Sequence, residues 1–106
     1  MEKKPVTDAQ TFSAERFTKQ FLYKKGGSNV FVLNFSPGQE LPPHKHPGHE
    51  LFILVLEGGG TMTVNGEPIA VTQGDTVYCE SEELFSFQNT GDRNTSLYVV
   101  LSKTAM

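Results

Sequence analysis

Short stretches of alternating apolar and polar residues, separated by glycine and proline, run along most of the chain. Stretches of about four to eight residues with this alternation are typical of half-buried β-strands joined by turns. We expect strands over residues 16–23, 30–35, 50–57, 61–64, 68–71, 76–79, 84–89 and 96–102. Helical periodicity is nearly absent, so the pattern predicts an all-β protein.

The residues between these stretches are typical of turns. Asn65-Gly66 is a strong signal for a two-residue hairpin, and residues 25–28 contain two glycines between the first two strands. Leu41-Pro42-Pro43 is expected to be extended, because proline fixes its own φ and disfavours helix before it. Many short, evenly spaced antiparallel strands favour a sandwich or a closed barrel, which leaves few exposed sheet edges.

The length of 106 residues suits one domain, which we expect to span residues 1–106. Residues 1–14 are polar and are expected to form a loosely ordered N-terminal arm. A chain this small would gain stability from a partner subunit or a bound ion. We therefore predict a homodimer, in which Phe12, Phe17 and Phe21 either cover a neighbouring barrel or close their own.

Charge and hydropathy exclude several classes of protein. Nine Lys and Arg residues against twelve Asp and Glu residues give a net charge of −3, without the basic stripe that binds nucleic acid. The longest apolar run, Leu51–Leu56, is far below the roughly 20 residues that span a bilayer. Positive charge at the start has no apolar segment behind it, and the lone Cys79 cannot form an internal disulfide. We expect a soluble, cytoplasmic protein with no nucleic-acid or membrane partner.

Candidate chemistry lies on the extended segment after the prolines. His44 and His46 are two residues apart, so their imidazoles project from the same face of an extended chain, and Glu50 keeps that parity. Two imidazoles and one carboxylate suit Fe(II), Zn, Mn, Ni or Cu, and on iron this set leaves open positions for substrate and oxygen. The three residues are therefore predicted to meet at one point.

The residues after Glu50 extend this argument. Phe52, Leu54 and Leu56 have the same parity, so the face with the carboxylate is expected to run into an apolar interior. Buried polar groups need partners, which a metal ion or a proton-sharing network of His and Glu would supply. His49 has the opposite parity and is expected in the loop or on the outer face, with a role as an extra ligand or an acid/base as the alternative.

The spacing of these residues is similar to the first motif of the cupin family. That motif is Gly, five residues, His, any residue, His, three or four residues, Glu, six residues and Gly. Gly38, His44, His46 and Glu50 fit this pattern, and Gly58 comes one residue late, which a β-bulge could absorb.

The second motif of the family is only partly present. It reads Gly, five residues, Pro, any residue, Gly, two residues, His, three residues and Asn. Gly74 and Asn89 match its ends, but Glu80 and Glu82 replace the Pro and the Gly, and Phe85 replaces the His that would be a fourth metal ligand.

The resemblance implies an antiparallel jelly-roll β-barrel, the double-stranded β-helix, with a metal inside and frequent dimers. Members of the family include dioxygenases, isomerases, decarboxylases, storage proteins and small-molecule sensors, so the fold alone selects no function.

Two functions follow as hypotheses, and whether the chain is an enzyme stays open. In the first, His44, His46 and Glu50 hold a divalent transition metal (Fe, Mn, Ni or Zn) in a dioxygenase- or isomerase-like enzyme that acts on a small organic substrate. In the second, the barrel is a non-catalytic module that binds or senses a small ligand at a degenerate metal site. The residues predicted to line the pocket in either case are Phe52, Met62, Tyr78, Phe85, Phe87 and Tyr98.

Overall fold

The computed structural model describes residues 1–104, which form nine β-strands and one short 3-10 helix. In chain order these elements are η1 (Val6–Ala9), β1 (Thr18–Lys25), β2 (Ser28–Phe35), β3 (Glu40–His44), β4 (His49–Glu57), β5 (Gly59–Val64), β6 (Glu67–Thr72), β7 (Thr76–Cys79), β8 (Phe85–Gln88) and β9 (Thr95–Lys103). Each of the eight predicted ranges overlaps a strand. The unpredicted strand is β3, where the extended proline segment pairs with β8.

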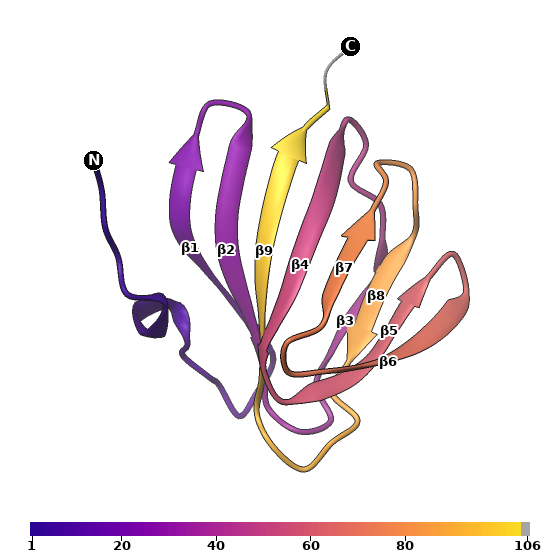
Figure 1. The fold of residues 1–106 in the computed structure, drawn as a ribbon. Coiled ribbons are helices and arrows are strands. Elements are labelled where there is room, and N and C mark those ends of the chain that lie inside the picture. The colour runs from indigo at the N-terminus through magenta and orange to yellow at the C-terminus, as the bar shows by residue number, and fades with distance from the viewer. Residues whose placement is uncertain (105–106) are drawn as a thin grey trace.

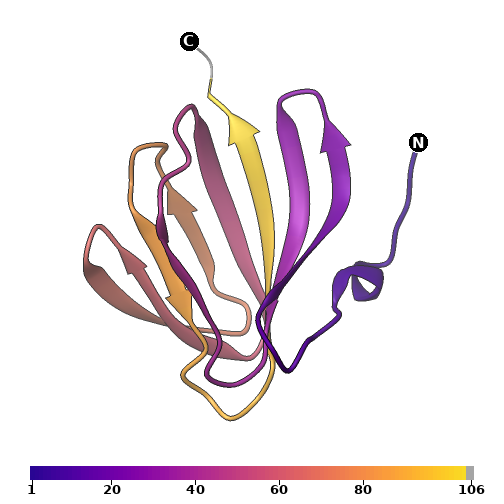
Figure 2. The same cartoon turned by 180° about the vertical axis from the view of Figure 1, so that it is seen from behind.

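The strands form two antiparallel sheets that face each other. One sheet has the order β1-β2-β9-β4-β7 and the other β3-β8-β5-β6. The strands converge at one end of the molecule and splay apart at the other (Figure 1). From behind, the four-stranded sheet is in front (Figure 2). This arrangement confirms the predicted all-β, antiparallel jelly roll.

The core lies between the two sheets and follows from the period of two along each strand. Phe35 is completely buried and lies at its centre, with ring centroids 5.3 Å from Phe17 and 4.8 Å from Phe87. Each fully buried side chain of this size contributes about 1.5–3 kcal/mol by leaving water. The other buried members of this cluster are Phe31, Leu33, Leu51, Ile53, Val55, Met62, Val71, Cys79, Phe85, Leu97 and Val99.

The N-terminal segment packs on the outside of the five-stranded sheet. Ala9, at the end of η1, is only 2% exposed and packs with Leu22 and Val32. The side-chain amide of Asn34 donates a hydrogen bond of 2.7 Å to the carbonyl oxygen of Ala9. Part of the segment expected to be a loose arm is therefore held against the sheet.

Within residues 1–104 no helix is long and apolar enough to cross a membrane. The predicted homodimer stays a prediction. Phe17, one of the residues proposed for its interface, packs inside its own barrel against Phe35.

Candidate functional site

A cavity of about 180 Å³ lies inside the barrel, between the two sheets. Its walls are mostly apolar, and three polar side chains reach it, those of Lys19, His44 and His46. The remaining lining residues are Phe17, Phe31, Leu33, Leu41, Leu51, Ile53, Phe85 and Val99. The cavity contains the predicted histidine pair, so it is the candidate functional site.

The two imidazoles meet as the sequence predicts. Nε2 of His44, at the end of β3, lies 3.1 Å from Nε2 of His46. Nδ1 of His44 lies 2.9 Å from the carbonyl oxygen of Pro42, which can only accept, so this nitrogen carries the hydrogen. In the neutral ring Nε2 of His44 is therefore an acceptor, and Nε2 of His46 donates to it.

His46 is held in its neutral form. Its pKa is lowered from 6.5 to about 4, mainly because burial disfavours the charged form and also because a second positive charge would be repelled by His44, Lys19 and His49 in their charged forms. At neutral pH this imidazole is an uncharged hydrogen-bonding group at the edge of an apolar cavity.

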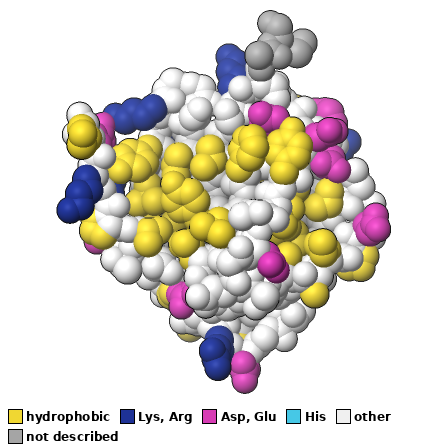
Figure 3. Space-filling view, viewed as in Figure 1, with side chains coloured by type: hydrophobic (Ala, Val, Ile, Leu, Met, Phe, Trp, Pro, Cys, Tyr) yellow, Lys and Arg dark blue, Asp and Glu magenta, His cyan; other side chains and the backbone are white. Residues whose placement is uncertain are grey.

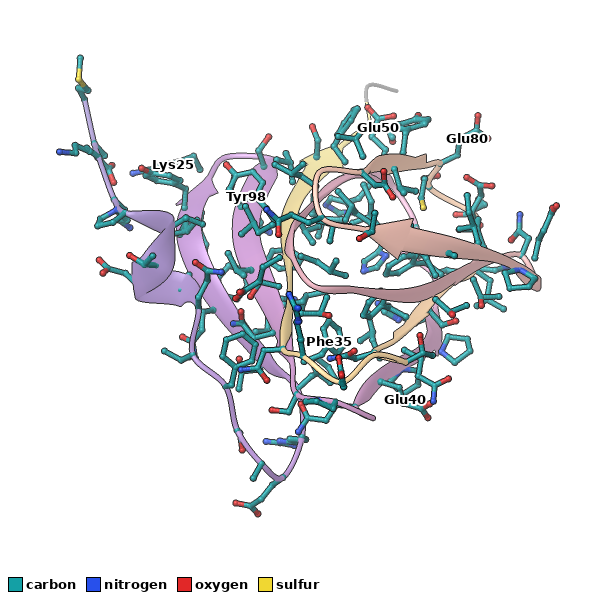
Figure 4. The ribbon with its side chains drawn as sticks, turned by 60° about the horizontal axis from the view of Figure 1, so that its bottom comes forward. Lys25, Phe35, Glu40, Glu50, Glu80 and Tyr98 are labelled. Carbon is teal, nitrogen blue, oxygen red and sulfur yellow. The ribbon has the colours of Figure 1, made fainter. Side chains whose placement is uncertain are left out.

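Glu50 does not join the pair, and the prediction that it faces the same point is wrong. Its Oε2 accepts a hydrogen bond of 2.6 Å from the hydroxyl of Tyr78 on the outer face of the five-stranded sheet. Figure 4 shows Glu50 and Glu80 at the same end of the molecule, well apart from the buried Phe35. The inward side chain next to Glu50 is that of Leu51, which is 4% exposed and lines the cavity.

The reason is a tight turn between the histidines and β4. Gly48 has a φ of +78°, and the amide of His49 donates a hydrogen bond of 3.0 Å to the carbonyl oxygen of His46. Alternation of side chains holds only while the backbone stays extended. The parity counted from His46 is therefore lost at Gly48 before the chain reaches Glu50.

Gly58 provides a better reference point for β4. Its φ is +75°, and a Cβ at this position would lie 2.4 Å from the carbonyl oxygen of Asn94, so no other residue fits without a shift. Six residues separate Gly58 from Leu51, and four separate Leu51 from His46, which are both spacings of the first motif. Leu51 therefore stands where the motif has its Glu. The register of β4 does shift between Val55 and Glu57, but Glu50 still faces outward.

The predicted pocket residues divide between two faces. Phe85 lines the cavity, with its ring centroid 6.4 Å from that of His44. Met62 and Phe87 are 0% and 1% exposed and belong to the core beside the cavity.

The other three predicted pocket residues lie outside the barrel, which corrects the prediction. Phe52 and Tyr78 are 45% and 50% exposed, and their rings pack at 5.1 Å. Together with Tyr98 they line a shallow groove of about 450 Å³ on the outer face of the five-stranded sheet. Figure 3 shows apolar side chains gathered on this face. Phe52 has the same parity as Glu50, so the prediction that placed Glu50 inside the barrel also placed Phe52 there, whereas both face outward.

The donor set does not fit the predicted metal centre. Among residues 1–104, no group of three His, Cys, Asp or Glu side chains is placed to hold a metal ion. The carboxylate of Glu50 is engaged outside, and leucine and phenylalanine stand at the two further ligand positions of the motifs. His49 has the parity of Leu51 but does not line the cavity, and its Nδ1 lies 3.2 Å from the carbonyl oxygen of Pro47.

Lys19 is a site residue that the sequence analysis missed. It lies on β1 opposite Leu33, and its ammonium nitrogen is 4.4 Å from the ring centroid of Phe31 and 5.1 Å from that of Phe21. Burial lowers the pKa of this lysine. The sequence did contain a signal for it. In the strand predicted over residues 16–23, Phe17, Lys19 and Phe21 project from the same face, so Lys19 lies between two aromatic residues.

Residues 31–101 match the family model described as Cupin domain, which is well over half of the chain. The chain belongs to the cupin family. The oxalate-binding protein of Thermotoga maritima is 29% identical to this cupin over 89 residues, which cover 83% of this chain and 72% of the relative.

Two further comparisons bear on the fold and on possible chemistry. The 5-nitrosalicylic acid 1,2-dioxygenase of a Bradyrhizobium species is 33% identical over 64 residues, but these cover 60% of this chain and only 30% of the dioxygenase. The solved structure of TT1209 from Thermus thermophilus superposes on this cupin with a TM-score of 0.91 at 20% identity, and covers 97% of this chain and 98% of its own. That structural likeness supports the double-stranded β-helix and no particular activity.

Proposed function

We propose that this cupin binds a small organic molecule in its barrel cavity without a metal centre. The observation that carries the proposal is the register of β4, in which Leu51 lines the cavity while Glu50 bonds to Tyr78 outside. With Phe85 opposite, the places of two ligands in the family motifs are apolar walls.

The remaining shape and chemistry suit a small ligand. A cavity of about 180 Å³ is smaller than the roughly 300–1,000 Å³ of pockets for drug-sized ligands, so it suits a smaller molecule. Binding pockets typically combine apolar walls with a few polar groups that orient the ligand, and here His44, His46 and Lys19 are those groups. The relative that is named for binding oxalate supports a binding role for this cavity.

A metal-dependent reaction is the second candidate. It is favoured by the relative named as a dioxygenase and by the anchoring of Nδ1 of His44 to the carbonyl oxygen of Pro42, a contact common among metal-bound histidines. Two imidazoles would then hold the ion together with water or substrate. No carboxylate of the cavity would assist them.

A fragment screen by amide NMR, with the protein in excess chelator, tests the proposal. Fragments are expected to shift the signals of cavity residues such as His46, Phe85 and Val99, and the shifts are expected to persist in chelator. Leu51→Phe fills the cavity and should abolish them, whereas Phe52→Leu on the outer face should leave them unchanged. Circular dichroism and thermal melting establish that both variants fold.

Two outcomes would overturn the proposal. In the first, no fragment shifts any cavity signal of the wild-type protein. In the second, the shifts vanish in chelator and return with Mn(II) or Fe(II), which would establish the metal-dependent candidate instead.

A further inference from the structure

The cavity contains one cationic side chain and no acidic one. Lys19 is the single Lys or Arg among its lining residues, and none of them is Asp or Glu. Lys19 is itself an exposed residue of β1, so its ammonium group lies at the solvent-facing edge of the cavity. Lys25, further along the same strand, is paired with the carboxylate of Glu2.

Lys19 has no carboxylate partner within residues 1–104. The ion pair between Lys25 and Glu2 is the single one found in this part of the chain. Its ammonium group instead lies over the rings of Phe31 and Phe21. Contact with the faces of aromatic rings stabilises a cation but leaves its N–H groups free to donate. Phe31 lines the cavity, so the ammonium group over its ring lies at the cavity edge, where an entering ligand can reach it.

We propose that the ligand is a small organic monoanion, such as a monocarboxylate with an apolar body. Its charged group pairs with the ammonium of Lys19, and its body lies against Leu51, Phe85 and Val99. This inference rests on the proposed function and narrows it to a class of ligand.

The single cation also limits the charge of the ligand. A charge moved from water to an apolar environment without a partner loses several kcal/mol of solvation. The single negative charge of a monoanion pairs with the ammonium group of Lys19, and the ligand then has no further charge that needs a partner. A dianion of similar size would place its second charge against the apolar walls, so we expect it to bind more weakly.

Matched probes separate charge from shape. Isobutyrate and benzoate are the anionic probes, isobutyramide and benzamide are their neutral counterparts, and malonate is the dianion. Dissociation constants are measured by NMR titration at neutral pH, in chelator and at constant ionic strength. A hydrogen bond to a charged group is stronger than one to a neutral group, and exposure to solvent weakens this advantage, so each acid is expected to bind about five- to tenfold tighter than its amide.

Substitutions of Lys19 test whether this residue causes the preference for the acid over the amide. Lys19→Met keeps most of the side-chain length and should remove the preference for the acid while leaving amide binding unchanged. Lys19→Arg should preserve the preference. Lys24→Met is the matched control, because Lys24 also lies over the ring of Phe21 but does not line the cavity.

The outcomes distinguish a failure of the monoanion inference from a failure of the proposed binding function. If the amides bind as tightly as the acids, or malonate binds tighter than either acid, the monoanion is wrong and the proposed binding function survives. If Lys19→Met keeps the full preference, Lys19 is not the anion-binding residue and the inference is also overturned. If no probe shifts a cavity signal although fragments of the screen do, the inference is overturned and the proposed function survives; if neither probes nor fragments shift one, both are contradicted.

Discussion

Both faces of β4 carry apolar side chains, but only the inner face is buried in the core. On the inner face Leu51, Ile53 and Val55 are 4%, 3% and 1% exposed and pack between the sheets. On the outer face Phe52 is 45% exposed, and Glu50 beside it bonds to Tyr78. In a strand that is apolar on both faces, hydrophobicity cannot say which face is inside, and a shift of one residue exchanges them. The candidate site depends on that one-residue difference.

The largest expected difference between the two faces is in stability. Leu51→Ala should lower the free energy of unfolding by about 2–5 kcal/mol, because it leaves a cavity in the core. Phe52→Ala should lower it by less than about 1 kcal/mol, since its ring is half exposed. Urea denaturation measures both values, and a larger loss for Phe52→Ala would reverse the assignment of the faces.

A carboxylate on the inner face should create the metal site that the wild-type cavity lacks. In Leu51→Glu the new side chain faces His44 and His46, and Mn(II) at 100 times its dissociation constant should stabilise the fold by about 2.7 kcal/mol. The melting temperature of the wild-type protein should not respond to Mn(II).

Glu50→Gln is the matched control and should melt like the wild type with or without Mn(II). If Leu51→Glu fails to fold, Leu51→His offers a third imidazole in its place. An Mn(II) response of the wild-type protein that Glu50→Gln abolishes would contradict this account.

The pH dependence of stability probes the inner face through His46. Its folded pKa of about 4 lies below the ordinary value of 6.5, so the unfolded chain binds the proton more readily. The stabilising contribution is complete above pH 6.5 and is lost as the pH falls from 6.5 towards 4. His46→Gln should flatten the profile measured by urea denaturation over this range. An imidazole NMR signal of His46 that titrates near 6.5 would be inconsistent with its burial.

The smallest effect is expected on the outer face. The hydrogen bond to Glu50 is the main cause that raises the pKa of Tyr78 from 10.0 to about 12. Glu50→Gln should lower that pKa towards its ordinary value, as followed by the ultraviolet absorbance of tyrosinate, with Tyr78→Phe to assign the transition. If Glu50 faced the cavity, the titration of Tyr78 would not change.

Much of the fold could be predicted from the sequence. Hairpins such as Asn65-Gly66 and the glycines and prolines between alternating runs mark the ends of the strands, and these signals are local. The meeting of His44 and His46 was also predictable, because both lie on one extended segment held by prolines.

The place of Glu50 could not be obtained in the same way. Its parity depended on whether residues 47–49 stay extended, and the positive φ of Gly48 ends that geometry. Counting back from Gly58 would have pointed to Leu51, since a glycine required by close backbone contacts is a firmer reference than a loop. Lys19 was missed because its role depends on β1 folding over the cavity, a contact between distant parts of the chain.

The register of β4 is the central claim, and thiol labelling tests it most directly. Cys79 gives a low background, because it is 1% exposed and burial raises its pKa to about 11. Single cysteines are introduced as Glu50→Cys and Leu51→Cys, and each variant is treated with a maleimide too bulky for the cavity. We predict that Glu50→Cys reacts at least about tenfold faster than Leu51→Cys. Faster labelling of Leu51→Cys would place Glu50 inside the barrel and contradict the account.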